Sequence, residues 1–181
     1  MVDTKRTLTA IYALLADNTT GLISPQDIRD TVATLAPGHG ELSITASAAT
    51  TISTADTFTA VAGTYALSGN AMNWDMNTNG QLRYTGTPDR VVHIANSLSF
   101  TTAGNNKVME IAVAKNGTPI ASSTVSRKTG TSGDVGSTAV HAFTSVSTND
   151  YLTVMISNTT DTVDSTVTYL NLFAMDMPIA S

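Results

Sequence analysis

The sequence predicts a mainly β protein whose first forty residues form a short helical segment. Threonine (32) and serine (17) are abundant among the 181 residues, whereas charged residues make up only 13%. Such a β-branched, uncharged composition favours strands over helices. Between residues 107 and 115, Met109, Ile111 and Val113 alternate with small or polar side chains, and Asn116-Gly117 follows at once. A period of two followed by this dipeptide is typical of a β-hairpin closed by a type I′ turn.

The helical segment, residues 1–40, begins with an amphipathic pattern over residues 4–16. Leu8, Ile11, Tyr12 and Leu15 fall at i, i+3, i+4 and i+7, the spacing of one helical face. These positions predict a first helix with a single apolar stripe.

A second helix is predicted to start after Ser24, which has the character of an N-cap. Pro25 takes the first helical position and Asp27 lies three residues after the cap, as in a capping box. Its apolar stripe consists of Ile28, Val32 and Leu35, and the run from Pro37 to Gly40 ends it.

Two helices this short cannot bury both stripes against each other. The stripes therefore need a partner, which is the β body, a sister subunit or another protein. We treat their apolar side chains as candidates for an anchor to a second protein: Leu8, Ile11, Leu15, Ile28, Val32 and Leu35.

The β body, residues 41–181, is predicted to consist of short strands joined by turns. Asn79-Gly80 and Gly104-Asn105-Asn106 mark two further reversals, and the glycine-rich run 126–138 is predicted to be a loop. The strands are expected at residues 42–46, 56–61, 63–67, 72–76, 81–84, 90–100, 107–115, 120–122, 139–143, 151–156 and 166–177.

No catalytic, cofactor or metal site is expected from the sequence. The chain lacks cysteine, and His39, His93 and His141 are too widely spaced for an HExxH motif, so His39 in a linker and His93 in a strand are given no role. Asp161 and Asp164 flank a loop without the spacing of a calcium-binding loop.

Charge and hydropathy exclude two further classes of partner. A net charge of −5 offers no basic patch for nucleic acid. No stretch is apolar enough to span a bilayer or to act as a signal peptide, so we expect no membrane partner and synthesis in a cytoplasm.

The order of segments in the β body resembles that of a known family. LRYTG (82–86), VVHIANSLSF (91–100), VMEIAVAKNGTPI (108–120), STNDYLTVMISN (147–158) and STVTYLNLFAMDM (165–177) together are similar to the TNF/C1q-type jelly roll found in many bacteriophage virion proteins. Residues 17–35 also resemble N-terminal segments of phage virion structural proteins. The resemblance implies an antiparallel jelly-roll β-sandwich after the helical segment.

Members of this family are usually homotrimers whose subunits pack through one apolar sheet face. The resemblance therefore makes Tyr151, Met155, Tyr169 and Phe173 candidates for the trimer contact, although the same side chains would also suit the subunit's own core.

The resemblance also implies a non-enzymatic structural protein located in the virion. Since the chain has no heptad, collagen or β-helical repeat for a shaft, we favour a capsid decoration (cement) protein that binds the major capsid protein or another virion protein. The alternative is a short head or tail fibre that binds a host surface glycan, with Trp74 stacking on a sugar beside Asn70, Asn73 and Asp75.

Overall fold

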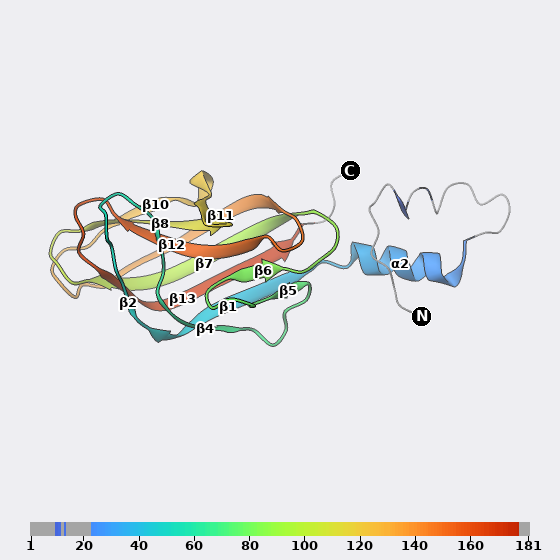
Figure 1. The fold of residues 1–181 in the computed structure, drawn as a ribbon, viewed down its shortest axis with the longest axis horizontal. Helices are drawn as coiled ribbons and strands as arrows, with labels where there is room; N and C mark the ends of the chain where they lie inside the picture. Colours follow the sequence, from blue (N-terminus) through green and yellow to red (C-terminus); the bar gives the residue numbers. More distant parts are fainter. Residues whose placement is uncertain (1–9, 12, 14–22, 178–181) are drawn as a thin grey trace.

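The computed structural model describes residues 10, 11, 13 and 23–177, and these residues form a β-sandwich with one helix beyond its end. Two antiparallel sheets pack face to face, and helix α2 (Pro25–Leu35) projects from one end of the sandwich, away from both sheets (Figure 1). The predicted class, a mainly β sandwich preceded by a helical segment, is confirmed.

The first sheet contains the long strands of the molecule. Its main order is β11-β7-β13-β1-β4, with β2 paired to β13. Its strands are β1 (His39–Ser47), β2 (Ala49–Thr50), β4 (Gly63–Leu67), β7 (Arg90–Thr102), β11 (Gly136–Val146) and β13 (Ser165–Asp176).

The second sheet has the main order β10-β8-β12-β6-β5, with β3 paired to β12 and β9 paired to β8. Because neighbours in both sheets are mostly far apart in the sequence, the chain passes repeatedly between the sheets, as in a jelly roll. Its strands are β3 (Thr59–Ala60), β5 (Trp74–Asp75), β6 (Leu82–Tyr84), β8 (Val108–Lys115), β9 (Thr118–Pro119), β10 (Val125–Lys128) and β12 (Tyr151–Asn158).

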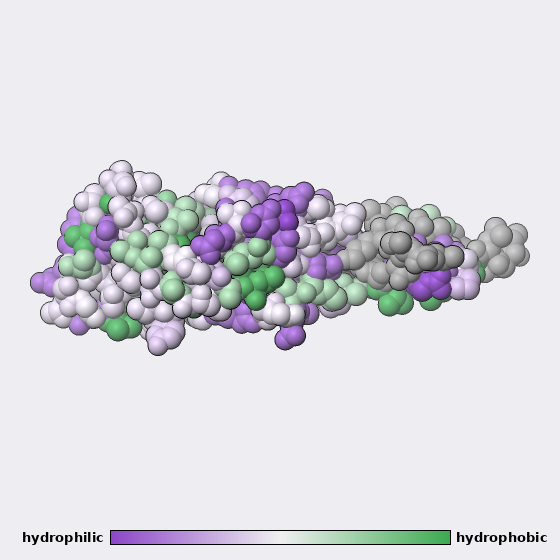
Figure 2. Space-filling view, turned by 60° about the horizontal axis from the view of Figure 1, so that its bottom comes forward, coloured by the Kyte–Doolittle hydropathy of each residue, from purple (hydrophilic) through white to green (hydrophobic). Residues whose placement is uncertain are grey.

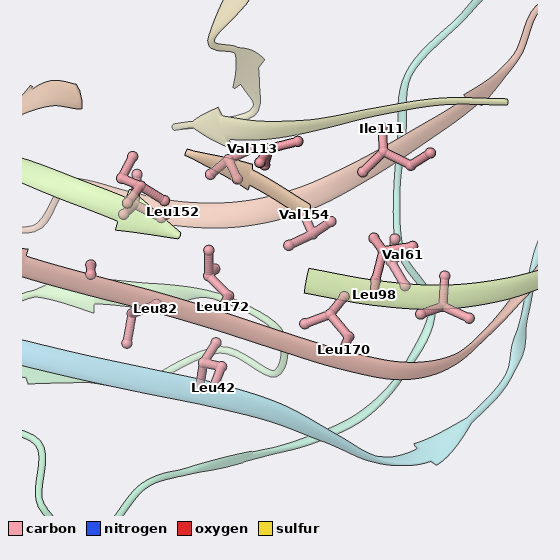
Figure 3. Packing of buried hydrophobic residues seen from close by; sticks show 14 of the residues in the cluster. Leu42, Val61, Leu82, Leu98, Ile111, Val113, Leu152, Val154, Leu170 and Leu172 are labelled. Carbon is pink, nitrogen blue, oxygen red and sulfur yellow. The ribbon is translucent and has the colours of Figure 1, made fainter. Parts of the chain in front are cut away.

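The core lies between the sheets and is filled by alternate residues of the long strands. Figure 3 shows Leu98, Leu170 and Leu172 of the first sheet facing Ile111 and Val154 of the second. All five are at most 4% exposed. Since alternate residues of a strand point to opposite faces, the side chains between them face outward.

Helix α2 starts as the sequence predicts. The Ser24 side chain accepts a hydrogen bond from the Asp27 backbone N–H (3.2 Å), and the Asp27 carboxylate accepts one from the Ser24 backbone N–H (2.8 Å). This is a complete capping box, with Pro25 in the first turn. Of the predicted first helix, Ala10, Ile11 and Ala13 are helical, and its other residues lie outside the described part of the chain.

The hairpin at Asn116-Gly117 also forms as predicted. Asn116 has φ 50° and Gly117 has φ 79°, the two positive values of a type I′ turn, and β8 pairs with β9 across it. The strand expected at 120–122 is wrong, because the second strand, β9, covers Thr118–Pro119 and ends before it. A 3-10 turn (Ala121–Ser123) follows, and the chain returns to β8 as β10.

The left-handed conformation of Gly117 gives a first prediction. We expect Gly117→Ala to lower the free energy of unfolding by about 1 kcal/mol, because a Cβ disfavours positive φ. Gly69→Ala is the matched control, since a Cβ there meets no atom within 4 Å and φ is not positive. Urea denaturation of both variants checks the prediction, and equal losses would contradict it.

Three other predicted boundaries are wrong. The run 126–138 is not one loop, because β10 takes its first residues and β11 starts at Gly136. The strand expected at 56–61 covers only Thr59–Ala60. The β body starts at His39, before the predicted boundary at residue 41, because His39 already pairs with Met175 of β13.

Candidate oligomer interface

The outer face of the first sheet carries large apolar side chains at the end nearest α2. Register places His39, Met175, His93 and Phe143 in one row across β1, β13, β7 and β11. The next row contains Glu41, Phe173, Ala95 and His141. Tyr169 lies farther along β13, beyond a row of Asn171, Ser97 and Ala139. We call the following set the apolar face: Val91, His93, His141, Phe143, Tyr169, Phe173 and Met175.

Several side chains of the apolar face are largely exposed. Phe143 is 59%, Tyr169 76% and Val91 50% exposed. Every exposed large hydrophobic side chain that a described strand carries belongs to this sheet, and none belongs to the second. Figure 2 shows hydrophobic surface interrupting the weakly polar surface of the sandwich. The outer faces of the two sheets therefore differ. Among the described strands, only those of the first sheet expose large apolar side chains, which is typical of a contact with another subunit.

Small side chains occupy the middle of the same sheet and leave an open hollow of about 550 Å³. Tyr169 and Ile44 are among its lining residues and lie next to register shifts in β13 and β1. Each shift leaves an extra threonine, and its hydroxyl donates to a neighbouring strand: Thr168 to the Ser99 carbonyl (3.2 Å) and Thr45 to the Thr64 carbonyl (3.1 Å). The bulges thus set the shape of this surface. The other lining residues are Ser43, Ser97, Leu98, Ser99, Ser137, Thr138, Ala139, Leu170 and Asn171.

Two histidines that are distant in sequence meet on the apolar face. His93 Nε2 lies 3.0 Å from His141 Nδ1, with the rings nearly parallel at 13°. The Phe143 ring is 5.3 Å from the His93 ring, centroid to centroid. From the sequence alone, His93 is given no role because the histidines are widely spaced, but the pairing of β7 with β11 brings its ring against that of His141. His39, expected in a linker, is the first residue of β1.

The four predicted trimer-contact residues do not form one cluster. Tyr169 and Phe173 belong to β13 and to the apolar face. Tyr151 and Met155 belong to β12 of the second sheet, where they alternate with the core residues Leu152 and Val154 and so face the opposite side of the sandwich. All four lie outside the core, since Tyr151, Met155 and Phe173 are half-buried and Tyr169 is exposed.

Trp74, the predicted glycan-binding residue, is in the core. It is 4% exposed, its ring meets Tyr84 edge to face at 5.2 Å, and its indole Nε1 donates to Asp176 (3.4 Å). Asp75 beside it pairs with Arg83 (2.6 Å), which lowers the pKa of the Asp75 carboxyl. The Trp74 ring cannot stack on a sugar from this position, so the glycan role assigned to it is wrong.

Asp176 is the centre of a buried polar cluster where α2 joins the sandwich. Its carboxylate accepts a hydrogen bond from the Gly38 backbone N–H (2.9 Å), and its backbone N–H donates to the Gly38 carbonyl (2.8 Å). The Arg90 Nε lies 3.7 Å from the carboxylate. Burial raises the pKa of the nearby Tyr84 hydroxyl, and the Asp176 charge raises it further. No sequence pattern links these residues, which come from β6, β7, β13 and the residue just before β1.

The loop considered for calcium is held by protein contacts. Asp161 forms an ion pair with Lys107, whose hydrogen bond lowers the pKa of the carboxyl. The Asp164 carboxylate accepts a hydrogen bond from the Ile52 backbone N–H (3.0 Å). Both carboxylates therefore tie this loop to neighbouring segments. Within residues 23–177 and the three helical residues before them, no group of three or more His, Cys, Asp or Glu side chains could hold a metal ion.

The anchor candidates divide into three groups. Ile28, Val32 and Leu35 are 50%, 64% and 53% exposed along α2, where Figure 2 also shows hydrophobic surface. Ile11 is only 2% exposed, which is inconsistent with a place on an exposed anchor. Leu8 and Leu15 lie outside the described residues. In the described part of the chain, no helix has the length and hydropathy of a membrane span.

No protein-family model and no curated protein sequence matches the chain. Among solved structures, Eiger TNF from S. frugiperda is similar over 81% of this chain and 96% of its own, with a TM-score of 0.55 and 7% identity. Murine APRIL at pH 5.0 is similar over 77% of this chain and 99% of its own, with a TM-score of 0.48 and 11% identity. The chain thus has a TNF-like jelly-roll fold, and at these identities the likeness is one of fold alone.

Proposed function

We propose that the protein is a non-enzymatic structural component of a bacteriophage virion. In this proposal it is a homotrimer that decorates the capsid and is attached to it through its N-terminal helical region. The main support is the placement of two exposed apolar surfaces, the apolar face on the first sheet and the stripe Ile28, Val32 and Leu35 on α2.

The apolar face supports the trimer. Exposed apolar surface concentrated on one sheet is typical of a contact between subunits, and a TNF-like fold is consistent with that arrangement. In our proposal the threefold axis runs along the sandwich. Cyclic symmetry would then bring the three α2 helices to the same end of the trimer.

Three helices at one end support attachment to a larger surface. Each presents the stripe Ile28, Val32 and Leu35, and three weak contacts made together give much stronger binding than one. The phage assignment itself rests on the resemblance of residues 17–35 and of the strand order to virion proteins. A capsid position is favoured over a fibre because the sequence has no shaft repeat, and the burial of Trp74 removes the residue on which the glycan alternative relied.

Two measurements test the proposal. Light scattering of the full chain should give three times the chain mass of 18.8 kDa. Immunogold labelling of virions from a phage that carries this gene should mark the capsid. Labelling of the tail would favour the fibre alternative, and unlabelled virions would overturn the virion assignment.

A truncation separates the anchor from the trimer contact. We expect deletion of residues 1–36 to leave a folded trimer that no longer sediments with undecorated capsids, because the chain then still begins before Gly38 and keeps its hydrogen bonds to Asp176. In the full chain, Val32→Asp should weaken sedimentation with capsids, whereas Arg29→Ala, an exposed change off the apolar stripe, should not. Full binding by the truncated chain would rule out the anchor.

A further inference from the structure

We propose that His93 and His141 of one chain together chelate a divalent transition-metal cation such as Ni²⁺, Cu²⁺ or Zn²⁺. The two residues lie on neighbouring strands, and their nearest ring nitrogens, His93 Nε2 and His141 Nδ1, are 3.0 Å apart. Both rings are on the outer face of the first sheet, His141 exposed and His93 half-buried in the single chain, so a hydrated cation can approach them before subunits associate.

The distance between the two nitrogens is the distance expected for two imidazole ligands of one metal ion. Imidazole nitrogens bind Zn²⁺ at roughly 2.0–2.1 Å, so two of them on the same ion are about 2.9–3.4 Å apart for angles between a right angle and the tetrahedral value. The observed 3.0 Å falls in this range. Chelation requires only that the rings turn until both lone pairs point at the same ion.

The backbone under the pair is already fixed. β7 and β11 pair without a register shift over their whole contact, from Arg90 opposite Val146 to Phe100 opposite Gly136. Both histidines lie within this ladder. His141 is directly opposite Ala95 and His93 opposite Phe143, which makes the histidines diagonal neighbours. Little conformational entropy is therefore lost when the metal binds, because the strands that carry both ligands are ordered beforehand.

The proton balance of the step is simple. When both rings are neutral, the hydrogen bond between them uses one N–H and one lone pair, whichever ring donates. A bound cation takes the lone pairs of both nitrogens, so the donor ring moves its proton to its other nitrogen. Both rings stay neutral, and no proton is released from the pair.

The ligand type selects the class of cation. Imidazole suits Ni²⁺, Cu²⁺ and Zn²⁺, whereas Mg²⁺ and Ca²⁺ prefer oxygen ligands. No third His, Cys, Asp or Glu completes a metal-holding group among the described residues, so water fills the remaining positions. Both protein ligands come from one chain, so the site needs no second subunit, although the proposed trimer would cover it.

Isothermal titration of the tag-free full chain with NiCl₂ and with ZnCl₂ tests the site. We expect saturable binding by the unmodified protein, no binding of CaCl₂, and loss of the signal in both His93→Ala and His141→Ala. The matched control is His39→Ala, which removes the third histidine from the same face, two strands away from His93, and should leave binding unchanged.

A second readout reports directly on the rings. Histidine ¹⁵N NMR of the full chain should show the shifts of His93 Nε2 and His141 Nδ1 moving when Zn²⁺ is added. His93→Gln and His141→Gln serve as replacements for an alanine variant that fails to fold. Absence of binding in the unmodified chain, or binding that survives either histidine substitution, would overturn the site. Because the proposed trimer would cover the pair, light scattering of the same samples shows in which subunit state the cation binds.

Discussion

Asp176→Ala is expected to lower the free energy of unfolding by about 3–5 kcal/mol, the largest loss that we predict for a single side chain. Asp176 is 2% exposed, and its carboxylate accepts hydrogen bonds from the Gly38 N–H and the Trp74 indole N–H. It also faces the buried guanidinium of Arg90. Removing the carboxylate takes the acceptor from two buried N–H donors and a counter-charge from Arg90, and buried groups that lose such partners are costly.

The exposed pair of Asp75 and Arg83 provides the control for this prediction. Asp75→Ala removes an ion pair of 2.6 Å whose side chains remain 38% and 28% exposed. Solvent screens such a pair, so the loss should be below about 1 kcal/mol. Urea denaturation at one protein concentration compares the two variants, since an oligomer adds concentration-dependent stability. Similar losses for both would show that the Asp176 cluster contributes no special stability.

Phe143→Glu is expected to dissociate the proposed trimer into monomers. Phe143 is 59% exposed beside His93 on the apolar face, and glutamate there would bring a charge into a subunit contact. An unpaired charge in an apolar contact costs about 2 kcal/mol or more, and each 1.4 kcal/mol is a tenfold loss of affinity. Light scattering over a range of protein concentrations measures the shift in mass.

Val135→Glu is a closely matched control for the change at Phe143. Val135 is 63% exposed, but it lies in the loop before β11 and outside the apolar face. The same charge there should leave the trimer intact. A trimer that tolerates Phe143→Glu would place the subunit contact elsewhere, and Tyr151→Glu on the opposite face would then be the next variant to measure.

Local features of this fold can be predicted from the sequence because each depends on a few neighbouring residues. The capping box at Ser24 and Asp27 depends on one helical turn. The hairpin at Asn116-Gly117 depends on two residues that tolerate positive φ. Along β7, Val92, Ile94, Leu98 and Phe100 share one parity in the sequence, and all four are buried in the core.

The candidate sites could not be predicted in the same way because they depend on strand order. Tyr151 and Tyr169 have similar apolar surroundings in the sequence, yet the chain crossings place them in different sheets. His93 and His141 are 48 residues apart and meet only because β7 pairs with β11. Trp74 is buried because the end of β13 returns Asp176 to its indole N–H. Its polar sequence neighbours had made it the candidate for stacking on a sugar.

The junction between α2 and the sandwich also determines how the protein would bear a mechanical load. A pull on α2 enters the sandwich through residues 36–38 and passes directly into β1, which lies between β13 and β4. Since the helix continues away from the end of the sheet (Figure 1), the force runs roughly along the strand, and the hydrogen bonds of both ladders resist it together in shear. The hydrogen bonds between Gly38 and Asp176 are the first to be loaded. A chain tethered by its N-terminal region would therefore need a higher force to unfold than a chain that is pulled from an edge strand. In the second case the hydrogen bonds of the strand would break one after another.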